Sequence, residues 1–293
     1  MLHQPVRIAD PGSLHSSLTP HDIHLTSETH VYEKWSSGLP VLLYHGIGPS
    51  HALAPPGLTV SAADFRRQMA WLAARGYHSA TVEDCIAHAC GNPSSKRLVV
   101  ITFDDGYASL CDYAFPVLQH YGFTAIVFVP TALIGRATVW DEREGWGSQA
   151  IMSHDQIRMW SVKGVEFGSH TRTHPDLTRL HEAELADEIV GSSHDLEHLL
   201  ATPTRAFAYP YGYVSESARM ITTRTYPVAF STIEGVNRPG GESSMLRRTM
   251  VFPADGLADL ALILRFGVNH RARLRKRLGR WRRQLRPQSR SNP

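Results

Sequence analysis

The stretch LVVITFDDG, residues 98–106, decides the fold, because it is an apolar strand that ends in two carboxylates and a glycine. The run 98–102 has the length and composition expected for a strand buried on both faces. Asp104 and Asp105 follow it at once, and Gly106 can adopt an unusual backbone conformation in the turn. In parallel α/β folds the reactive groups lie where strands end and loops begin, so this turn is a candidate site.

Strands and helices alternate along the chain on both sides of this stretch. Apolar runs with strand character occur at 41–44, 98–102, 124–129, 165–168, 206–209, 228–231 and 249–252. Helical spacing or helix signals occur at 61–76, 107–121, 154–162, 182–200, 215–224 and from Leu257 onward. This alternation predicts parallel strand pairing, and about seven repeats of it favour closure into a barrel over an open sheet.

Composition indicates one globular α/β domain. The chain has 293 residues, of which 42% are hydrophobic and 19% charged, and this argues against a disordered or fibrous protein. Its three cysteines, Cys85, Cys90 and Cys111, include no CxxC pair, which argues against a disulfide framework and a cysteine-built zinc site. No signal-like start and no run of ~18 apolar residues is visible. We therefore expect a cytoplasmic protein in a reducing compartment.

The two ends of the chain differ from its body. Residues 1–37 are polar, rich in histidine and without periodicity, so they are predicted to be an N-terminal arm. The domain is predicted at 38–266 and a basic amphipathic tail at 267–293. From Arg265 to Pro293 the chain has ten Arg, one Lys and no acid, so with a net charge of +3 overall, residues 1–264 carry −8.

The tail has two interpretations. Its apolar residues are spaced 4, 3 and 4 apart, which lines them along one helical face among basic side chains: Leu274, Leu278, Trp281 and Leu285. Such a segment can lie on an anionic membrane surface, which would make the protein peripheral at the inner membrane face. The other interpretation is a solvated basic end with no specific partner. Nucleic acid is disfavoured, because no base-reading fold is predicted.

A second polar cluster, GSHTRTHP at 168–175, follows the predicted strand 165–168. It places His170 and His174 four residues apart, close enough to bind one metal ion from a single turn. Pro175 keeps His174 out of the α region, which favours a tight turn over a helix. Alone, two histidines among 17 or an Asp-Asp-Gly turn are ordinary surface features. Together, at the ends of two strands, they indicate a site.

Two imidazoles and one carboxylate form a ligand set for a divalent cation such as Zn²⁺ that leaves positions open for water and substrate. The water becomes a nucleophile once a second carboxylate takes its proton, so the two aspartates are predicted to have different roles. A third segment, FAYPYG at 207–212, follows another strand. Its backbone N–H groups, including that of Tyr211, either point at a developing oxyanion or belong to an ordinary turn.

The motifs TFDDG, HTRTH and PYG, in this order and each after a strand, resemble the polysaccharide deacetylases, the NodB-homology or carbohydrate esterase 4 superfamily. The resemblance covers about residues 40–255, including QMAWLAARGY after the first strand and VFVPT after the Asp-Asp-Gly helix. It is closest to the branch that acts on poly-N-acetylglucosamine. The resemblance implies a distorted (β/α) barrel of the NodB-homology type, with about seven strands, and metal-dependent hydrolysis of an N-acetyl or O-acetyl group on a sugar.

The resemblance also implies roles for single residues. By position, Asp104 matches the family's catalytic base, and Asp105, His170 and His174 match its metal ligands. Tyr211 matches the residue whose backbone amide supports the oxyanion.

Two parts of the family pattern are absent. The arginine that orients the base is missing from Ala208-Tyr209-Pro210, so Arg247 or Arg248 is expected to supply this charge. The Leu-His pair near the C-terminus is not evident either. Leu43-Tyr44-His45 instead resembles the rearranged branch, in which an N-terminal histidine is the acid, so His45 is predicted to protonate the leaving amine. His270 or a solvent proton is the alternative.

The sequence thus predicts a metal-dependent hydrolase that removes acetyl groups, most of all N-acetyl groups of N-acetylglucosamine-type residues, from a polysaccharide or glycoconjugate. Zn²⁺ is the expected metal, with Co²⁺ and Ni²⁺ as alternatives. Rival interpretations are a metal hydrolase of non-sugar amides and a non-catalytic carbohydrate-binding protein. Trp140 and Trp146, in a polar insertion, either form an apolar floor for a sugar ring or pack that loop down.

Overall fold

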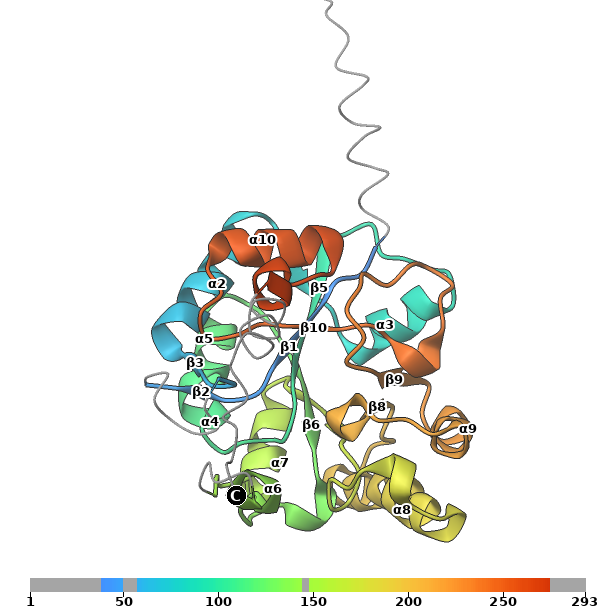
Figure 1. The fold of residues 1–293 in the computed structure, drawn as a ribbon. Coiled ribbons are helices and arrows are strands. Elements are labelled where there is room, and N and C mark those ends of the chain that lie inside the picture. Colours follow the sequence, from blue (N-terminus) through green and yellow to red (C-terminus); the bar gives the residue numbers. More distant parts are fainter. Residues whose placement is uncertain (1–37, 50–56, 144–147, 275–293) are drawn as a thin grey trace, which may run out of the picture. The chain divides into compact units, whose positions relative to one another are not determined.

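Seven parallel strands form the frame of the domain (Figure 1). Their spatial order is β10 (Thr249–Met250), β1 (Val41–Tyr44), β5 (Leu98–Phe103), β6 (Ile126–Val129), β7 (Glu166–Ser169), β8 (Ala206–Ala208) and β9 (Val228–Phe230). An additional short strand, β4 (His78–Ser79), pairs with the start of β5. The computed structural model describes residues 38–49, 57–143 and 148–274. The predicted arm 1–37, Trp146 and residues 275–293 of the predicted tail lie outside the described residues.

One segment, which includes β10, connects β9 at one edge of the sheet to β1. Leu246 forms a parallel bridge with Phe230 of β9, and its backbone N–H donates to the carbonyl of Ala229 at 2.8 Å. Directly after it, β10 pairs with β1. Residues 246–250 therefore link β9 to β1, and the predicted α/β fold, a distorted barrel of about seven parallel strands, is confirmed.

Alternate residues of each strand face the inside of the barrel. The inward side chains form one buried cluster that includes Val41, Val100, Ile126, Phe128, Ala206, Ala208, Val228 and Phe230. Their neighbours along the strands, such as Phe103 and Val127, belong to a separate cluster with the surrounding helices. Because side chains alternate along a strand, the inward set continues past the strand ends at His45, Asp104 and His170.

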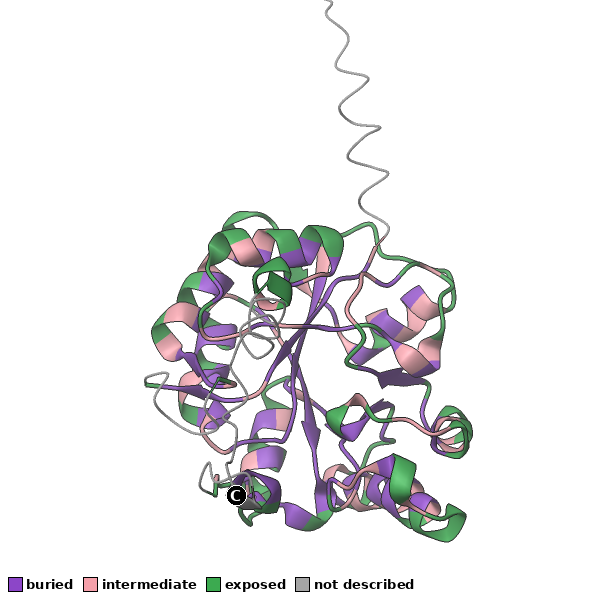
Figure 2. Cartoon of the chain, in the orientation of Figure 1, coloured by how far each residue is buried: buried purple, intermediate pink, exposed green. Residues whose placement is uncertain are grey.

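Helices cover the outside of the barrel. They are α2 (Ala62–Ala74), α4 (Leu110–Tyr113), α5 (Phe115–His120), α7 (His154–Val162), α8 (Glu182–Leu200), α9 (Glu216–Thr225) and α10 (Leu257–Phe266). Figure 2 shows that these helices are buried on one side only, whereas the long strands of the barrel are buried along most of their length. The apolar spacing in the sequence is the cause, since one stripe of each helix packs on the sheet. No described helix is long and apolar enough to span a bilayer.

Some elements were not predicted. Helix α3 (Val82–Ala89) follows β4 and places Val82 and Cys85 in the interior cluster. Two very short strands, β2 (Ile47–Gly48) and β3 (Val60–Ser61), pair beside β1. A strand of two residues is too short to produce a hydrophobic period. Helix α3 does have one, with Val82, Cys85, Ile86 and Ala89 at helical spacing after the Thr81 cap, and this signal was missed.

The predicted helix 107–121 is wrong in its first turn and is interrupted between α4 and α5. Tyr107 forms an antiparallel bridge with Ile151, and the backbone N–H of Ala108 donates to the carbonyl of Ala150 at 2.8 Å. Main-chain bonds to this insertion therefore replace the first helical turn that the apolar spacing predicts.

Candidate metal centre and active site

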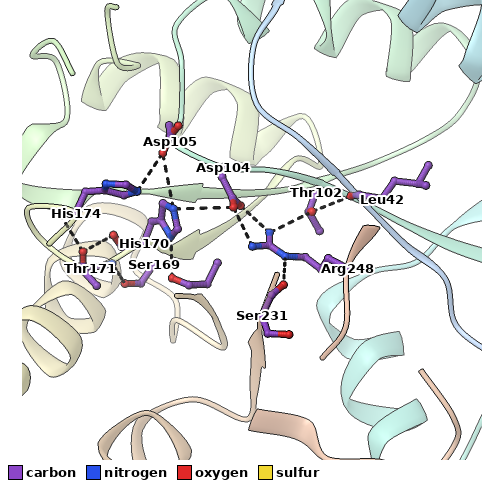
Figure 3. A network of polar contacts seen from close by, with 11 residues as sticks. Leu42, Thr102, Asp104, Asp105, Ser169, His170, Thr171, His174, Ser231 and Arg248 are labelled. Carbon is purple, nitrogen blue, oxygen red and sulfur yellow. Dashed lines mark hydrogen bonds and ion pairs between the residues drawn. The ribbon is translucent and has the colours of Figure 1, made fainter. Parts of the chain in front are cut away.

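The predicted site residues meet at the carboxyl ends of strands within one part of the sheet. Asp104 and Asp105 follow β5, and His170 and His174 follow β7, as Figure 3 shows. Tyr211 follows β8 in a short 3-10 turn. The parallel pairing of β5, β6, β7 and β8 brings these three loops together although they are far apart in the sequence.

The backbone of these loops is strained. Among the described residues, five other than glycine have a positive φ, and four of the five lie here: Asp105 (70°), Thr171 (67°), His174 (61°) and Tyr211 (57°). The left-handed region is unfavourable for residues with a Cβ atom and persists only where the surrounding structure enforces it. Gly106 (φ 63°) adds to this, because a Cβ atom there would lie 2.6 Å from Cγ1 of Val129.

Asp105, His170 and His174 point toward one another. One ligand atom of each lies within 4.8 Å of the others, and all three side chains are buried. Oδ1 of Asp105 is 3.4 Å from Nε2 of His174 and 3.7 Å from Nε2 of His170. This is the Asp-His-His donor set that divalent metals of the zinc type bind in proteins.

The two imidazole rings are held in different ways. Nδ1 of His170 donates to the backbone carbonyl of Ala208 at 2.7 Å, which leaves the lone pair of Nε2 directed at Asp105. Nδ1 of His174 is buried and has no hydrogen-bond partner. Aromatic contacts orient this ring instead, since Trp140 stacks on it at a centroid distance of 4.1 Å and Tyr211 meets it edge-on at 4.6 Å.

The electrostatics of the three residues favour a cation between them. Burial lowers the pKa of His170 and the pKa of His174, so both imidazoles are neutral near pH 7. Burial, together with the charges of Asp104 and Asp141, raises the pKa of Asp105 well above its usual range. A buried carboxylate in this position needs a positive charge to ionise, and neutral imidazoles can serve as its co-ligands. The donor set therefore fits a divalent metal ion.

Asp104 is held by an arginine from the segment directly before β10, which lies two strands from β5 in the sheet. Arg248 donates from Nη1 to Oδ1 at 2.6 Å and from Nη2 to Oδ2 at 2.8 Å, as Figure 3 shows. Its Nε donates to the carbonyl of Ser231 at 2.9 Å, and the residue is 1% exposed. Arg247 is exposed and donates to the carbonyl of Glu234. Of the two candidate arginines, Arg248 is the one that contacts Asp104.

This pair sets the charge of Asp104. Burial alone raises the pKa of Asp104, but the nearby charges of Arg248 and His170 outweigh burial and bring the pKa below its usual value. Asp104 therefore stays ionised at neutral pH, with Oδ2 4.0 Å from Nε2 of His170. An ionised carboxylate that lies beside a metal set without belonging to it is suited to accept a proton.

His45 follows β1 and is partly buried. Burial lowers its pKa to about 4, with the charge of Asp104 acting in the opposite direction. The free imidazole is neutral at pH 7, so a proton-donating role requires that it gain a proton during the reaction. Its role as the acid stays a prediction. His270, the alternative, is exposed beyond α10 against the ring of Phe266.

The insertion between β6 and α7 supports the metal set. Trp140, on the short helix α6 (Val139–Arg143), is 8% exposed and stacks on His174 with an angle of 28° between the rings. Of the two interpretations of Trp140, this contact favours packing over an open floor for a sugar ring.

The sequence did not identify Tyr107 and Asp141 as part of this site. The Tyr107 hydroxyl donates to Oδ2 of the buried Asp141 at 2.9 Å and also contacts Asp105. The Thr138 hydroxyl donates to the same oxygen of Asp141 at 2.7 Å. The one available signal was the Trp-Asp dipeptide in an otherwise polar insertion, which has no diagnostic spacing.

Helix α8 fixes the turn that carries both histidines. The carboxylate of Glu188 accepts hydrogen bonds from the backbone N–H groups of Arg172 at 2.8 Å and Thr173 at 2.9 Å, and from the Thr173 hydroxyl at 2.6 Å. The Arg172 guanidinium makes two bonds of 2.9 Å to Asp195. The strained conformations on either side of these residues are thus held by a helix outside the barrel.

Comparison with known sequences finds similarity to polysaccharide deacetylases. The family model described as polysaccharide deacetylase matches residues 91–226. YxkH of Bacillus subtilis is 27% identical over 217 residues, which cover 73% of this chain and 72% of that protein. The poly-beta-1,6-N-acetyl-D-glucosamine N-deacetylase of Staphylococcus epidermidis is 28% identical over 167 residues, or 54% of this chain. The chain spans 55% of that enzyme's length.

Two solved structures share the fold. The deacetylase PplD of Streptococcus pyogenes, solved with acetate, superimposes with a TM-score of 0.68 and 26% identity over 78% of this chain and 98% of PplD. IcaB of Ammonifex degensii superimposes with a TM-score of 0.67 and 27% identity over 78% of this chain and 97% of IcaB.

Proposed function

From the premise that the chain carries a polysaccharide deacetylase domain and is a hydrolase, we propose that it removes N-acetyl groups from N-acetylglucosamine-type residues of a polysaccharide or glycoconjugate. The observation that carries this proposal is a buried Asp104–Arg248 pair next to a buried Asp-His-His set. The sugar is supported by the similarity to poly-N-acetylglucosamine deacetylases such as that of S. epidermidis.

The proposed cofactor is a divalent metal ion, with Zn²⁺ as the first choice and Co²⁺ or Ni²⁺ as alternatives. Asp105, His170 and His174 would hold it. When bound, such an ion lowers the pKa of a water molecule and polarises the acetyl carbonyl. The neutral imidazoles and the raised pKa of Asp105 support this assignment.

Three residues of the chain have separate roles in the remaining steps of the reaction. Asp104, kept ionised by Arg248, takes the proton of the attacking water. The backbone N–H of Tyr211 donates to the oxyanion that forms on the acetyl group. His45, on the inward side of the end of β1 and neutral in the free protein, takes up the proton that Asp104 removed from the water and passes it to the departing amine. An amine leaves poorly unless it is protonated, so this last step matters more for an amide than for an ester.

The proposal is tested by measuring acetate released from N-acetylglucosamine oligomers. The wild-type protein is expected to release acetate, to lose activity with a chelator and to regain it with Zn²⁺. Asp105→Ala, His170→Ala and His174→Ala should each lose the ion and the activity together, whereas Asp104→Asn should keep the ion and lose turnover.

The outcomes separate the rival functions. A wild-type protein that binds oligomers but releases no acetate is a carbohydrate-binding protein. One that hydrolyses only non-sugar amides is a different metal hydrolase. An Asp104→Asn protein that lacks the ion, or that keeps its rate, contradicts the separate roles of the two aspartates.

We also propose a cytoplasmic location, with the basic tail on the anionic inner face of the membrane. The charge of residues 265–293 supports this, as does the described part of the tail, where Leu274 is 57% exposed. Removal of 270–293 should abolish co-sedimentation with anionic vesicles and leave hydrolysis of a soluble oligomer intact. Unchanged vesicle binding would contradict the membrane proposal, and binding to nucleic acid instead would replace it.

A further inference from the structure

A row of four aromatic rings leads from the candidate metal set to the surface. Trp140 stacks on His174, His174 meets Tyr211 at 4.6 Å, and Tyr211 meets Tyr213 at 5.7 Å with an angle of 32° between the rings. Exposure increases along the row, from 8% for Trp140 to 49% for Tyr211 and 52% for Tyr213. The row thus ends in two exposed rings beside a predicted metal ligand.

The backbone holds these two rings in place. Tyr211 has a φ of 57° and Gly212 a φ of 73°. A Cβ atom on Gly212 would lie 1.9 Å from the hydroxyl oxygen of Thr232, so only glycine fits the turn. The Gly212 N–H donates back to the carbonyl of Tyr209 at 3.0 Å. The backbone that carries both rings is therefore constrained, which lowers the cost of ordering this turn when a ligand binds.

The chemistry of the turn selects for a neutral ligand. Residues 209–214 read YPYGYV and carry no charged side chain. A nucleic acid or an acidic polymer would need basic groups at its contact surface, which this segment lacks. A pyranose ring has a face of C–H groups that packs on an aromatic ring, while its hydroxyls stay at the hydrated edge with the phenol groups.

We propose that Tyr211 and Tyr213 form a stacking platform for the sugar ring adjacent to the acetylated residue of the polymer. This inference rests on the proposed function, because the acetyl group is assumed to lie at the metal set next to His174. The platform continues from that set through ring contacts, so a second pyranose extends over Tyr213. It makes the enzyme selective for oligomers over a single N-acetylglucosamine.

The proposed stacking platform is tested by measuring sugar binding to a variant that does not turn over its substrate. In the Asp104→Asn protein, the dissociation constants of a β-1,6-linked N-acetylglucosamine pentamer and of the monosaccharide are measured by titration calorimetry. Adding Tyr213→Ala should weaken pentamer binding about 3- to 10-fold and leave monosaccharide binding nearly unchanged. Tyr213→Phe keeps the stacking face and should restore pentamer binding.

Met220→Ala is the matched control, since Met220 is a 48% exposed apolar residue on α9 and lies outside the aromatic row. The proposal is overturned if Tyr213→Ala and Met220→Ala bind the pentamer equally well, or if the parent protein binds no pentamer. A protein that binds the pentamer through Tyr213 but whose wild-type form releases no acetate would overturn the proposed function and leave the platform standing.

Discussion

The guanidinium of Arg248 is fully buried and contacts a carboxylate and two aromatic rings. Its side chain is 0% exposed, and its Cζ atom lies 5.4 Å from the ring of Phe128 and 5.9 Å from the ring of Phe230. The ion pair with Asp104 compensates the desolvation of both charges, and removal of either partner leaves the other buried alone. The residue therefore contributes to stability as well as to the charge of the candidate base.

Arg248→Lys is expected to lower deacetylation on the order of 100-fold, because an ammonium cannot bond both oxygens of Asp104 and the Ser231 carbonyl at once. Arg248→Met, which leaves Asp104 unpaired, should reduce the free energy of unfolding by about 3–5 kcal/mol in urea denaturation. Arg247→Lys, at the exposed neighbouring position, is the control and should change neither quantity. Wild-type turnover in Arg248→Lys would show that Asp104 does not need both hydrogen bonds from Arg248 for its role in the reaction.

His45→Ala is expected to keep its metal content and its fold but to lose turnover on the order of 10²–10⁴-fold, if the imidazole donates the leaving-group proton. The loss should be smaller for an aryl acetate, whose leaving group needs no proton, than for an N-acetyl sugar. Rates on both substrates and the metal content of the purified protein provide the check. Equal losses on the two substrates would assign His45 to substrate binding or to structure.

At the scale of elements, α8 acts as the outer support of the histidine turn through Glu188. Glu188→Gln replaces an acceptor of three hydrogen bonds by an amide with weaker acceptor capacity, so the turn loses rigidity. We expect the affinity for Zn²⁺ to fall roughly 10- to 100-fold, measured by titrating the apoprotein against a competing chelator. Activity does not enter this measurement.

Asp187→Asn is the control for this prediction, because Asp187 lies on the same helix and bonds the same loop through Arg172 but has a side chain that is 64% exposed. Its effect on metal affinity should be much smaller, since an exposed ion pair contributes little. Equal affinities in the two variants would mean that the backbone bonds of Glu188 do not position the histidines.

The sequence was informative where an element has its own periodicity and uninformative where two irregular segments meet. The strand ends at Asp104 and His170 could be located because buried parallel strands read as apolar runs. The contact of Tyr107 with Asp141 depends on the path of the insertion 131–152, which is polar and has no period. That path also explains the missing first turn of the helix after Gly106, because main-chain bonds to the insertion compete with helix formation.

At the scale of the whole molecule, a buried histidine outside the site links α3 to the loop after β9. His88 is 5% exposed, and its Nε2 donates to the carbonyl of Asn237 at 3.1 Å. Burial lowers the pKa of His88 below its usual 6.5, with the bond to Asn237 acting in the opposite direction. Because the folded-state pKa is below the unfolded value, the folded protein binds fewer protons. This part of the stability is complete above pH 6.5 and is lost as the pH falls below it.

His88→Gln should therefore flatten the dependence of the free energy of unfolding on pH between about pH 7 and pH 5. Urea denaturation at several pH values measures this pH dependence of the free energy of unfolding. The buried histidines of the site contribute with the same sign, so the slope should decrease without reaching zero. A wild-type slope in His88→Gln would mean that His88 titrates alike in both states.

Residues 246–250, which link β9 to β1, are synthesised after the rest of the candidate site. Asp104, Asp105 and both site histidines are translated before this segment, whereas Arg248 lies within it. A chain still on the ribosome, finished only to about residue 245, already contains the Asp-His-His set but lacks the guanidinium that keeps Asp104 ionised. Pairing of the final strand therefore closes the barrel and at the same time brings the guanidinium of Arg248 to Asp104. In a chain that ends before this segment, the proposed base would lack the charge that lowers its pKa.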